Sequence, residues 1–141
     1  MMYRLYTDGS CIGNPGAGGY GGVIESNGMT TEFKGAERHT TNNRMELMAV
    51  IQGLSIIPRG STVHIISDSQ YVLNGINKWI YGWEKRKFVD VKNGDLWVQF
   101  SNIRRDFTIT TEWVRGHNGH KQNERCDVLA HSEAIRILKG N

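Results

Sequence analysis

The dipeptide Asn27-Gly28 separates two segments that both have the composition of β-strands, residues 20–27 and 29–39. Asn-Gly between such segments favours a tight two-residue turn, and this turn fixes the flanking strands as an antiparallel hairpin. Residues 2–8 are a third strand candidate, which we expect to join residues 20–27 through a second hairpin. The chain is therefore expected to begin with three antiparallel strands.

The remaining pattern alternates between helices and strands, in the order β-β-β-α-β-α-α-β-α. Right-handed crossovers then place the last two strands parallel to the first. We predict an α/β fold in one domain, residues 1–141, with a five-stranded mixed sheet (three antiparallel strands, then two parallel ones) flanked by helices. The first helix is apolar nearly all round, so we expect it to be buried. The segments are helix 42–57, strand 63–67, helices 70–87 and 94–106, strand 108–114 and helix 123–139.

Composition favours a cytoplasmic protein. No apolar run approaches the roughly 20 residues of a membrane span, and the first residues, MMYRLYTDGS, lack the basic-then-apolar layout of a secretory signal. The two cysteines, Cys11 and Cys126, are too few for a disulfide framework. We therefore expect reduced thiols and no contact with a membrane.

The positive charge of the chain is concentrated between Lys78 and Lys92. This segment contains five basic and two acidic residues, which equals the net charge of +3 of the whole chain. Trp79, Tyr81 and Trp83 lie among these charges. Basic groups between flat aromatic rings are typical of nucleic-acid binding. The alternative is an amphipathic helix with a solvated basic face and buried rings.

Four acidic residues are expected at one edge of the sheet. Asp8 and Asp68 follow the first and fourth strands, and Glu46 and Asp127 lie near the starts of two helices at the same edge. Four carboxylates held together repel one another unless a cation joins them. Oxygen ligands suit magnesium or manganese, and a pair of such ions catalyses in-line displacement at phosphorus. Taken singly, each acid has the alternative role of bracing a turn or a helix start.

Gly16, Gly18 and Gly21 match the G-x-G-x-x-G pattern of dinucleotide-binding loops. That pattern requires a helix after the glycines, whereas here a predicted hairpin follows. No G-K-[ST] sequence follows either, so a P-loop is excluded. We instead expect the glycines to allow the backbone to come close to a partner beside Asp8.

Four stretches resemble the type I ribonucleases H, closely the bacterial kind: YTDGSCIGNPGAGGYG, TTNNRMELMAV, SDSQYV and WVRGHNGHKQNERCDVLA. The resemblance implies a ribonuclease H-like fold and a hydrolase that cuts the RNA strand of RNA–DNA hybrids without sequence preference, leaving 5′-phosphate and 3′-hydroxyl ends. It implies two Mg²⁺ ions, for which Mn²⁺ can substitute. Asp8 would contact both ions, Glu46 and Asp68 would complete one site, and Asp127 the other. His117 matches a catalytic histidine that assists turnover.

The same resemblance assigns the contacts to the hybrid. The RNA 2′-hydroxyl contacts fall to Gly9, Ser10, Cys11, Asn14, Asn43 and Gln70. Thr41 matches a phosphate pocket for the DNA strand, Asn14 and Asn42 reach toward the minor groove, and Trp79 packs against a deoxyribose. Each of Asn14 and Thr41 has an equal alternative as a turn or cap residue. The family suggests primer removal in DNA replication by a monomer that needs no protein partner.

One segment departs from the bacterial pattern. The stretch KFVDVKNGDLW is shorter and less basic than in relatives with a full basic protrusion, and Glu84 and Asp90 dilute its charge. We therefore expect intact cleavage chemistry but reduced affinity for the hybrid.

Three alternatives remain open. The first is a non-catalytic hybrid-binding module on the same fold, which would lack one of the metal-binding acids. The second is a related nuclease or strand-transfer enzyme, which would lack the TTNNRMEL and GHNGH stretches. The third is a zinc site formed by His117, His120 and Cys126, for which three ligands are too few for a structural site. In the absence of zinc, His120 would form a hydrogen bond with Asn123.

Overall fold

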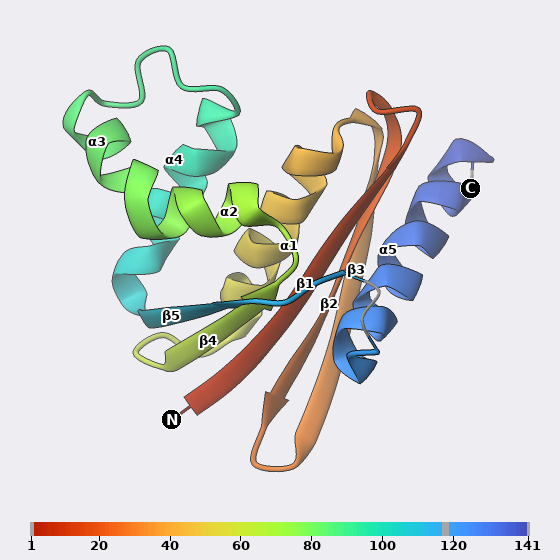
Figure 1. Cartoon of the computed structure of the whole chain (residues 1–141), viewed down its shortest axis with the longest axis horizontal. Coiled ribbons are helices and arrows are strands. Elements are labelled where there is room, and N and C mark those ends of the chain that lie inside the picture. The colour runs from red at the N-terminus through yellow and green to blue at the C-terminus, as the bar shows by residue number, and fades with distance from the viewer. Residues whose placement is uncertain (1, 117–118, 141) are drawn as a thin grey trace.

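A five-stranded mixed sheet forms the centre of the computed structural model, which describes residues 2–116 and 119–140 (Figure 1). The strands lie in the order β3-β2-β1-β4-β5. β2 pairs antiparallel with β1 and with β3, whereas β4 is parallel to β1 and to β5. This arrangement confirms the predicted fold. The strands are β1 Met2–Ile12, β2 Gly16–Ser26, β3 Met29–Thr40, β4 Thr62–Ser67 and β5 Thr108–Trp113.

The turn between β2 and β3 is the one that the Asn-Gly dipeptide predicts. Asn27 and Gly28 both have positive φ, 52° and 76°, and Ser26 pairs with Met29 across the two-residue loop. Both central residues of a type I′ hairpin turn require this left-handed conformation, which asparagine and glycine adopt at little cost. The turn therefore sets the register of the two strands.

The first hairpin extends further than predicted. β1 continues past Asp8 to Ile12, and β2 begins at Gly16, so that the glycines lie within a strand. Gly19 and Gly21 pack against the protein's own helix α5 (Lys121–Leu138): a Cβ atom on Gly19 would lie 2.2 Å from the carbonyl oxygen of Ala130. These two glycines therefore let a helix of the same chain pack closely on the sheet, which corrects, for them, the expectation of a partner beside Asp8.

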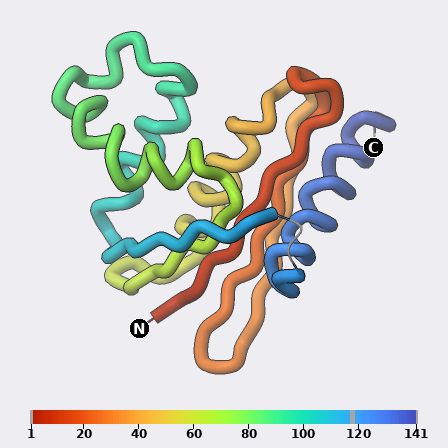
Figure 2. Tube along the Cα trace, in the orientation of Figure 1, coloured from red at the N-terminus to blue at the C-terminus, as the bar shows by residue number. Residues whose placement is uncertain are grey.

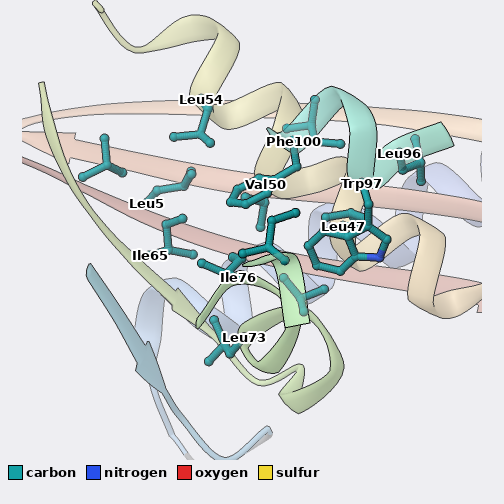
Figure 3. Close-up of a cluster of buried hydrophobic side chains, with 14 of the residues drawn as sticks. Leu5, Leu47, Val50, Leu54, Ile65, Leu73, Ile76, Leu96, Trp97 and Phe100 are labelled. Carbon is teal, nitrogen blue, oxygen red and sulfur yellow. The ribbon is translucent and has the colours of Figure 1, made fainter. Parts of the chain in front are cut away.

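Helices cover both faces of the sheet. α1 (Asn42–Ile56) and α4 (Gly94–Ile103) lie on one face and α5 on the other (Figures 1 and 2). α1 packs between β1 and α4, which explains why it is apolar nearly all round. Among the described residues, no helix has the length and the apolar character that crossing a membrane requires. The main core lies between the sheet and the α1 and α4 layer, and it includes Leu5, Leu47, Val50, Leu54, Ile65, Leu96, Trp97 and Phe100 (Figure 3).

The two long helices predicted after β4 are interrupted. Residues 70–85 form α2 (Gln70–Asn74), a π-helical turn η1 (Gly75–Trp79) and α3 (Ile80–Lys85). A Cβ atom on Gly75 would lie 2.2 Å from the Trp97 ring, so the indole packs directly against the π-helical backbone. The second helix ends at Ile103 and continues as a 3₁₀ turn, η2 (Arg104–Asp106).

Replacing Gly19 with alanine should destabilise the fold. The added Cβ would meet backbone atoms of α5, which cannot move aside as a flexible side chain can. We expect a loss of about 1–3 kcal/mol in the free energy of unfolding, as for other overpacked sites. Gly82→Ala is the control, because its Cβ would meet nothing within 4 Å in helix α3, and it should be neutral or stabilising by up to about 1 kcal/mol. Equal effects of the two changes in urea unfolding would contradict this account.

Candidate active site

Three carboxylates meet at the carboxyl edge of the parallel strands. One oxygen from each of Asp8, Glu46 and Asp68 lies within 4.8 Å of the other two. Asp8 belongs to β1, Glu46 to the first turns of α1, and Asp68 directly follows β4. The close approach of α1 to β1 depends on Gly9, since a Cβ there would lie 2.4 Å from the backbone nitrogen of Glu46. The sheet and the helix start thus bring the acids together.

Burial raises the pKa of two of these acids. Asp8 and Glu46 are each 5% exposed. Burial, followed by the negative charge of Asp68, raises the pKa of Asp8 to about 7. Burial and the charges of Asp8 and Asp68 raise the pKa of Glu46 well above its ordinary value. Part of the negative charge is therefore neutralised by protons near neutral pH until a cation replaces them.

The donor set fits a hard divalent cation. It consists of carboxylate oxygens, and Oε1 of Glu46 is buried without a hydrogen-bond partner in the part of the chain that the structure describes. Among the same residues, no lysine or arginine forms a salt bridge with any of the three acids. Oxygen ligands of this kind suit Mg²⁺ or Mn²⁺. A bound cation would supply the partner that Glu46 lacks.

The fourth predicted acid lies outside this group of three. Asp127 is half-buried on α5, and its charge contributes to the raised pKa of Asp8. It is therefore close enough to act on Asp8 electrostatically. His117, the predicted assisting histidine, lies outside the described residues.

Several residues that are predicted to contact the hybrid also form hydrogen bonds that hold the turn between β1 and β2 against the start of α1. Asn14 Oδ1 accepts a hydrogen bond from the backbone N–H of Asn42 at 2.9 Å. Thr41 caps α1, with its hydroxyl accepting from the N–H of Arg44 at 3.3 Å. The thiol of Cys11 donates to the carbonyl of Thr40. Gly9, Ser10, Asn42 and Asn43 are half-buried near these contacts, and Gln70 is exposed at the start of α2.

The basic segment exposes both its charges and one tryptophan. Trp79 is 42% exposed and contacts the rings of Tyr71 and Trp83 at centroid distances of 6.3 and 5.9 Å. Glu84 does not dilute the positive charge as expected, because it forms a 2.7 Å salt bridge with Arg104 outside the segment. The five basic side chains are all exposed: Lys78, Lys85, Arg86, Lys87 and Lys92.

Cys126 and His120 have different environments. Cys126 is fully buried in an apolar cluster with Tyr6 and Ile66, and burial raises the pKa of its thiol strongly. His120 is exposed at the start of α5. We expected a hydrogen bond between His120 and Asn123. The amide oxygen of Asn123 does not form it, since Oδ1 is buried without a partner among the described residues.

Three features of the site were not foreseen. Gly116 packs against Asp68, where a Cβ would lie 2.7 Å from Oδ2. The indole N–H of Trp113 donates to the backbone carbonyl of Asp68 at 3.1 Å. Arg44 joins α1 to the start of α4 through a two-bonded salt bridge with Asp95, at 2.9 and 2.7 Å. The sequence offered a signal for the two contacts with Asp68, because Trp113 and Gly116 come at and just after the end of a strand that points toward the acids.

Comparisons with known proteins agree on one family. The family model for RNase H matches residues 2–135. A ribonuclease H of Sulfurovum sp. is 50% identical over 133 residues, covering 94% of this chain and 90% of the relative. One from Cupriavidus metallidurans is 52% identical over 138 residues, covering 94% and 95%. In the crystal structure of LC9-RNase H1, a type 1 RNase H with the type 2 active-site motif, the matching chain is 30% identical with a TM-score of 0.86, covering 96% of this chain and 72% of that one.

Proposed function

The chain belongs to the ribonuclease H family, and from this premise we propose that it is an endonuclease that hydrolyses the RNA strand of RNA–DNA hybrids with two divalent metal ions. The observation that supports this function most strongly is the cluster of Asp8, Glu46 and Asp68, three carboxylates within 4.8 Å without a described cationic side chain bound to them. A non-catalytic module would have no need to maintain such a repulsive group.

The acids of this chain would hold the ions. Asp8 interacts with Glu46, Asp68 and Asp127, so it is suited to contact both ions, with Glu46 and Asp68 on one and Asp127 on the other. Bound Mg²⁺ or Mn²⁺ would activate a water molecule, balance the charge developing on phosphorus and hold the leaving 3′ oxygen, giving 5′-phosphate and 3′-hydroxyl ends. Asp8 and Glu46 would release their protons as the ions bind.

Recognition of RNA would depend on the 2′-hydroxyl, which both donates and accepts hydrogen bonds. Ser10 and Asn43 are polar residues on β1 and α1, which also position Asp8 and Glu46, and Gln70 begins α2 two residues after Asp68. Contacts to sugars and phosphates contain no base information, so cleavage would be independent of sequence. Because the basic segment is short, we predict a reduced affinity for the hybrid. This affinity should fall steeply as the salt concentration rises.

A cleavage assay on matched duplexes tests the proposed function. RNA–DNA, RNA–RNA and DNA–DNA duplexes of one sequence, each labelled on one strand, are incubated with Mg²⁺ or with chelator. We expect cutting of the RNA strand of the hybrid alone, and only with Mg²⁺. Equal cutting of the three duplexes, or no cutting of the hybrid, would reject the proposal.

Replacing Trp79 with alanine should weaken hybrid binding more than it slows the bound-state reaction. The variant would lose the proposed contact of this exposed ring with a deoxyribose of the DNA strand. We expect a cost comparable to that of an aromatic contact with one nucleotide, about 1–3 kcal/mol, or roughly 5- to 150-fold in the dissociation constant. Single-turnover kinetics separate the two effects. Val128→Ala, an exposed apolar side chain on α5, is the control and should change neither. A slowed reaction at saturating enzyme with unchanged binding would contradict the binding role.

A further inference from the structure

A polar groove lies between β5 and the side of α2 and η1 that faces it. Its volume is about 410 Å³. Gln70, Leu73, Asn74 and Asn77 line one wall, and Thr111 and Trp113 line the other. The spacing of the first four residues places them on one side of the helical segment. The groove begins next to Asp68, because Gln70 follows that residue by two positions and Trp113 binds its carbonyl.

Trp113 is fixed in this groove but remains accessible. Its indole N–H is satisfied by the carbonyl of Asp68 at 3.1 Å, while 46% of the residue stays exposed. What it offers to a ligand is therefore the apolar surface of the ring. On the opposite wall, the Asn77 amide donates to the hydroxyl of Thr111 at 2.9 Å and joins the two walls. Asn74 and Gln70 add amides, which both donate and accept hydrogen bonds.

We propose that this groove binds an unpaired nucleotide of the RNA strand next to the hybrid, an inference that rests on the proposed function. A base inside a duplex has neighbours on both faces, so a base that stacks on Trp113 has to lie at or beyond the end of the duplex. Under the proposed function the strand at the acid cluster is the RNA strand, and Gln70 is both a proposed contact to that strand and part of the lining of the groove. The amides suit base edges and the 2′-hydroxyl, and the volume lies within the usual range of about 300–1,000 Å³ for small-ligand sites.

Binding of matched hybrids in chelator tests this site. The probes are one blunt hybrid and the same hybrid extended by a few unpaired ribonucleotides at the 5′ or the 3′ end. We expect one of the two extended hybrids to bind about 5- to 20-fold more tightly than the blunt one, and Trp113→Ala to remove that advantage. Trp113→Phe keeps a ring but loses the hydrogen bond to Asp68, so it should retain most of the advantage.

A second variant covers the case in which Trp113→Ala fails to fold. Asn74→Leu removes an amide but keeps the side-chain size, and it should reduce the advantage about threefold, the effect of one lost hydrogen bond. Binding of the blunt hybrid should be unchanged by this substitution. Equal affinity of wild type for the blunt and extended hybrids, equal gain from a DNA extension, or an advantage insensitive to both Trp113→Ala and Asn74→Leu would overturn the proposal. Failure to cut the blunt hybrid with Mg²⁺ would instead reject the proposed function.

Discussion

Asp8→Asn is expected to lower the rate of hybrid cleavage at least about 10³-fold while the protein stays folded. Asp8 lies within 4.8 Å of both Glu46 and Asp68, so its loss affects the whole carboxylate group. Loss of a metal ligand removes several kcal/mol of transition-state stabilisation, and about 4 kcal/mol corresponds to 10³-fold. Asparagine has nearly the same volume as aspartate, so packing against α1 is preserved. Asp68→Asn should behave in the same way.

The control for this experiment is Asp106→Asn. It makes the same chemical change at the exposed turn η2, where Asp106 pairs with Arg59, and should leave cleavage unchanged. Single-turnover rates with saturating enzyme and Mg²⁺ give the comparison, and circular dichroism verifies folding. Retention by Asp8→Asn of more than about a tenth of wild-type activity, a loss under 1.4 kcal/mol, would contradict the metal-binding role.

The sheet was predictable because its signals are local. Asn27-Gly28 specifies its hairpin through the backbone preferences of two residues. The parallel strands follow from the handedness of crossovers, and topology then brings Asp8, Glu46 and Asp68 to one edge. The turn signal thus fixes one hairpin, and the crossover rule then fixes the direction of the strands that follow it.

Features that depend on packing between distant segments were not predictable in this way. The glycines of β2 suggest a loop by composition, yet Gly19 lies in a strand that pairs with β1 and β3, and its lack of a side chain leaves room for α5. The single helix expected at 70–87 is broken where Gly75 meets Trp97. In the sequence, Glu84 counts as a negative charge of the basic segment. In the structure it forms a salt bridge with Arg104, which lies 20 residues further along the chain. In each case the deciding partner lies far along the chain.

Asp8→Asn should also stabilise the chelated protein, and increasingly so as the pH rises. In the folded chain the pKa of Asp8 is about 7, against an ordinary value of 3.8. Folding therefore takes up a proton between these two values, and the free energy of unfolding decreases as the pH rises through this window. Below the ordinary pKa both states are protonated and the penalty is absent. Asparagine does not titrate, so the variant avoids this loss.

The expected gain is the difference in the free energy of unfolding between Asp8→Asn and wild type, measured with urea in chelator. It should be near zero at about pH 4 and grow to about 4 kcal/mol above pH 7 from Asp8 itself, since each unit of pKa corresponds to 1.36 kcal/mol. Glu46, whose pKa the charge of Asp8 also raises, adds to the gain in the same direction. Salt-bridged acids such as Glu32 and Asp95, whose pKa values are lowered, act alike in both proteins and cancel.

Mg²⁺ should reduce this difference in stability. A cation bound by the acids stabilises the folded wild type by mass action and removes the penalty of the buried charges. The variant lacks one ligand and should gain less, so the two proteins approach each other as the Mg²⁺ concentration rises. Asp106→Asn should follow wild type throughout. A difference between Asp8→Asn and wild type that is independent of pH, or an equal gain from Mg²⁺ in both, would show that Asp8 is not a buried, metal-compensated acid.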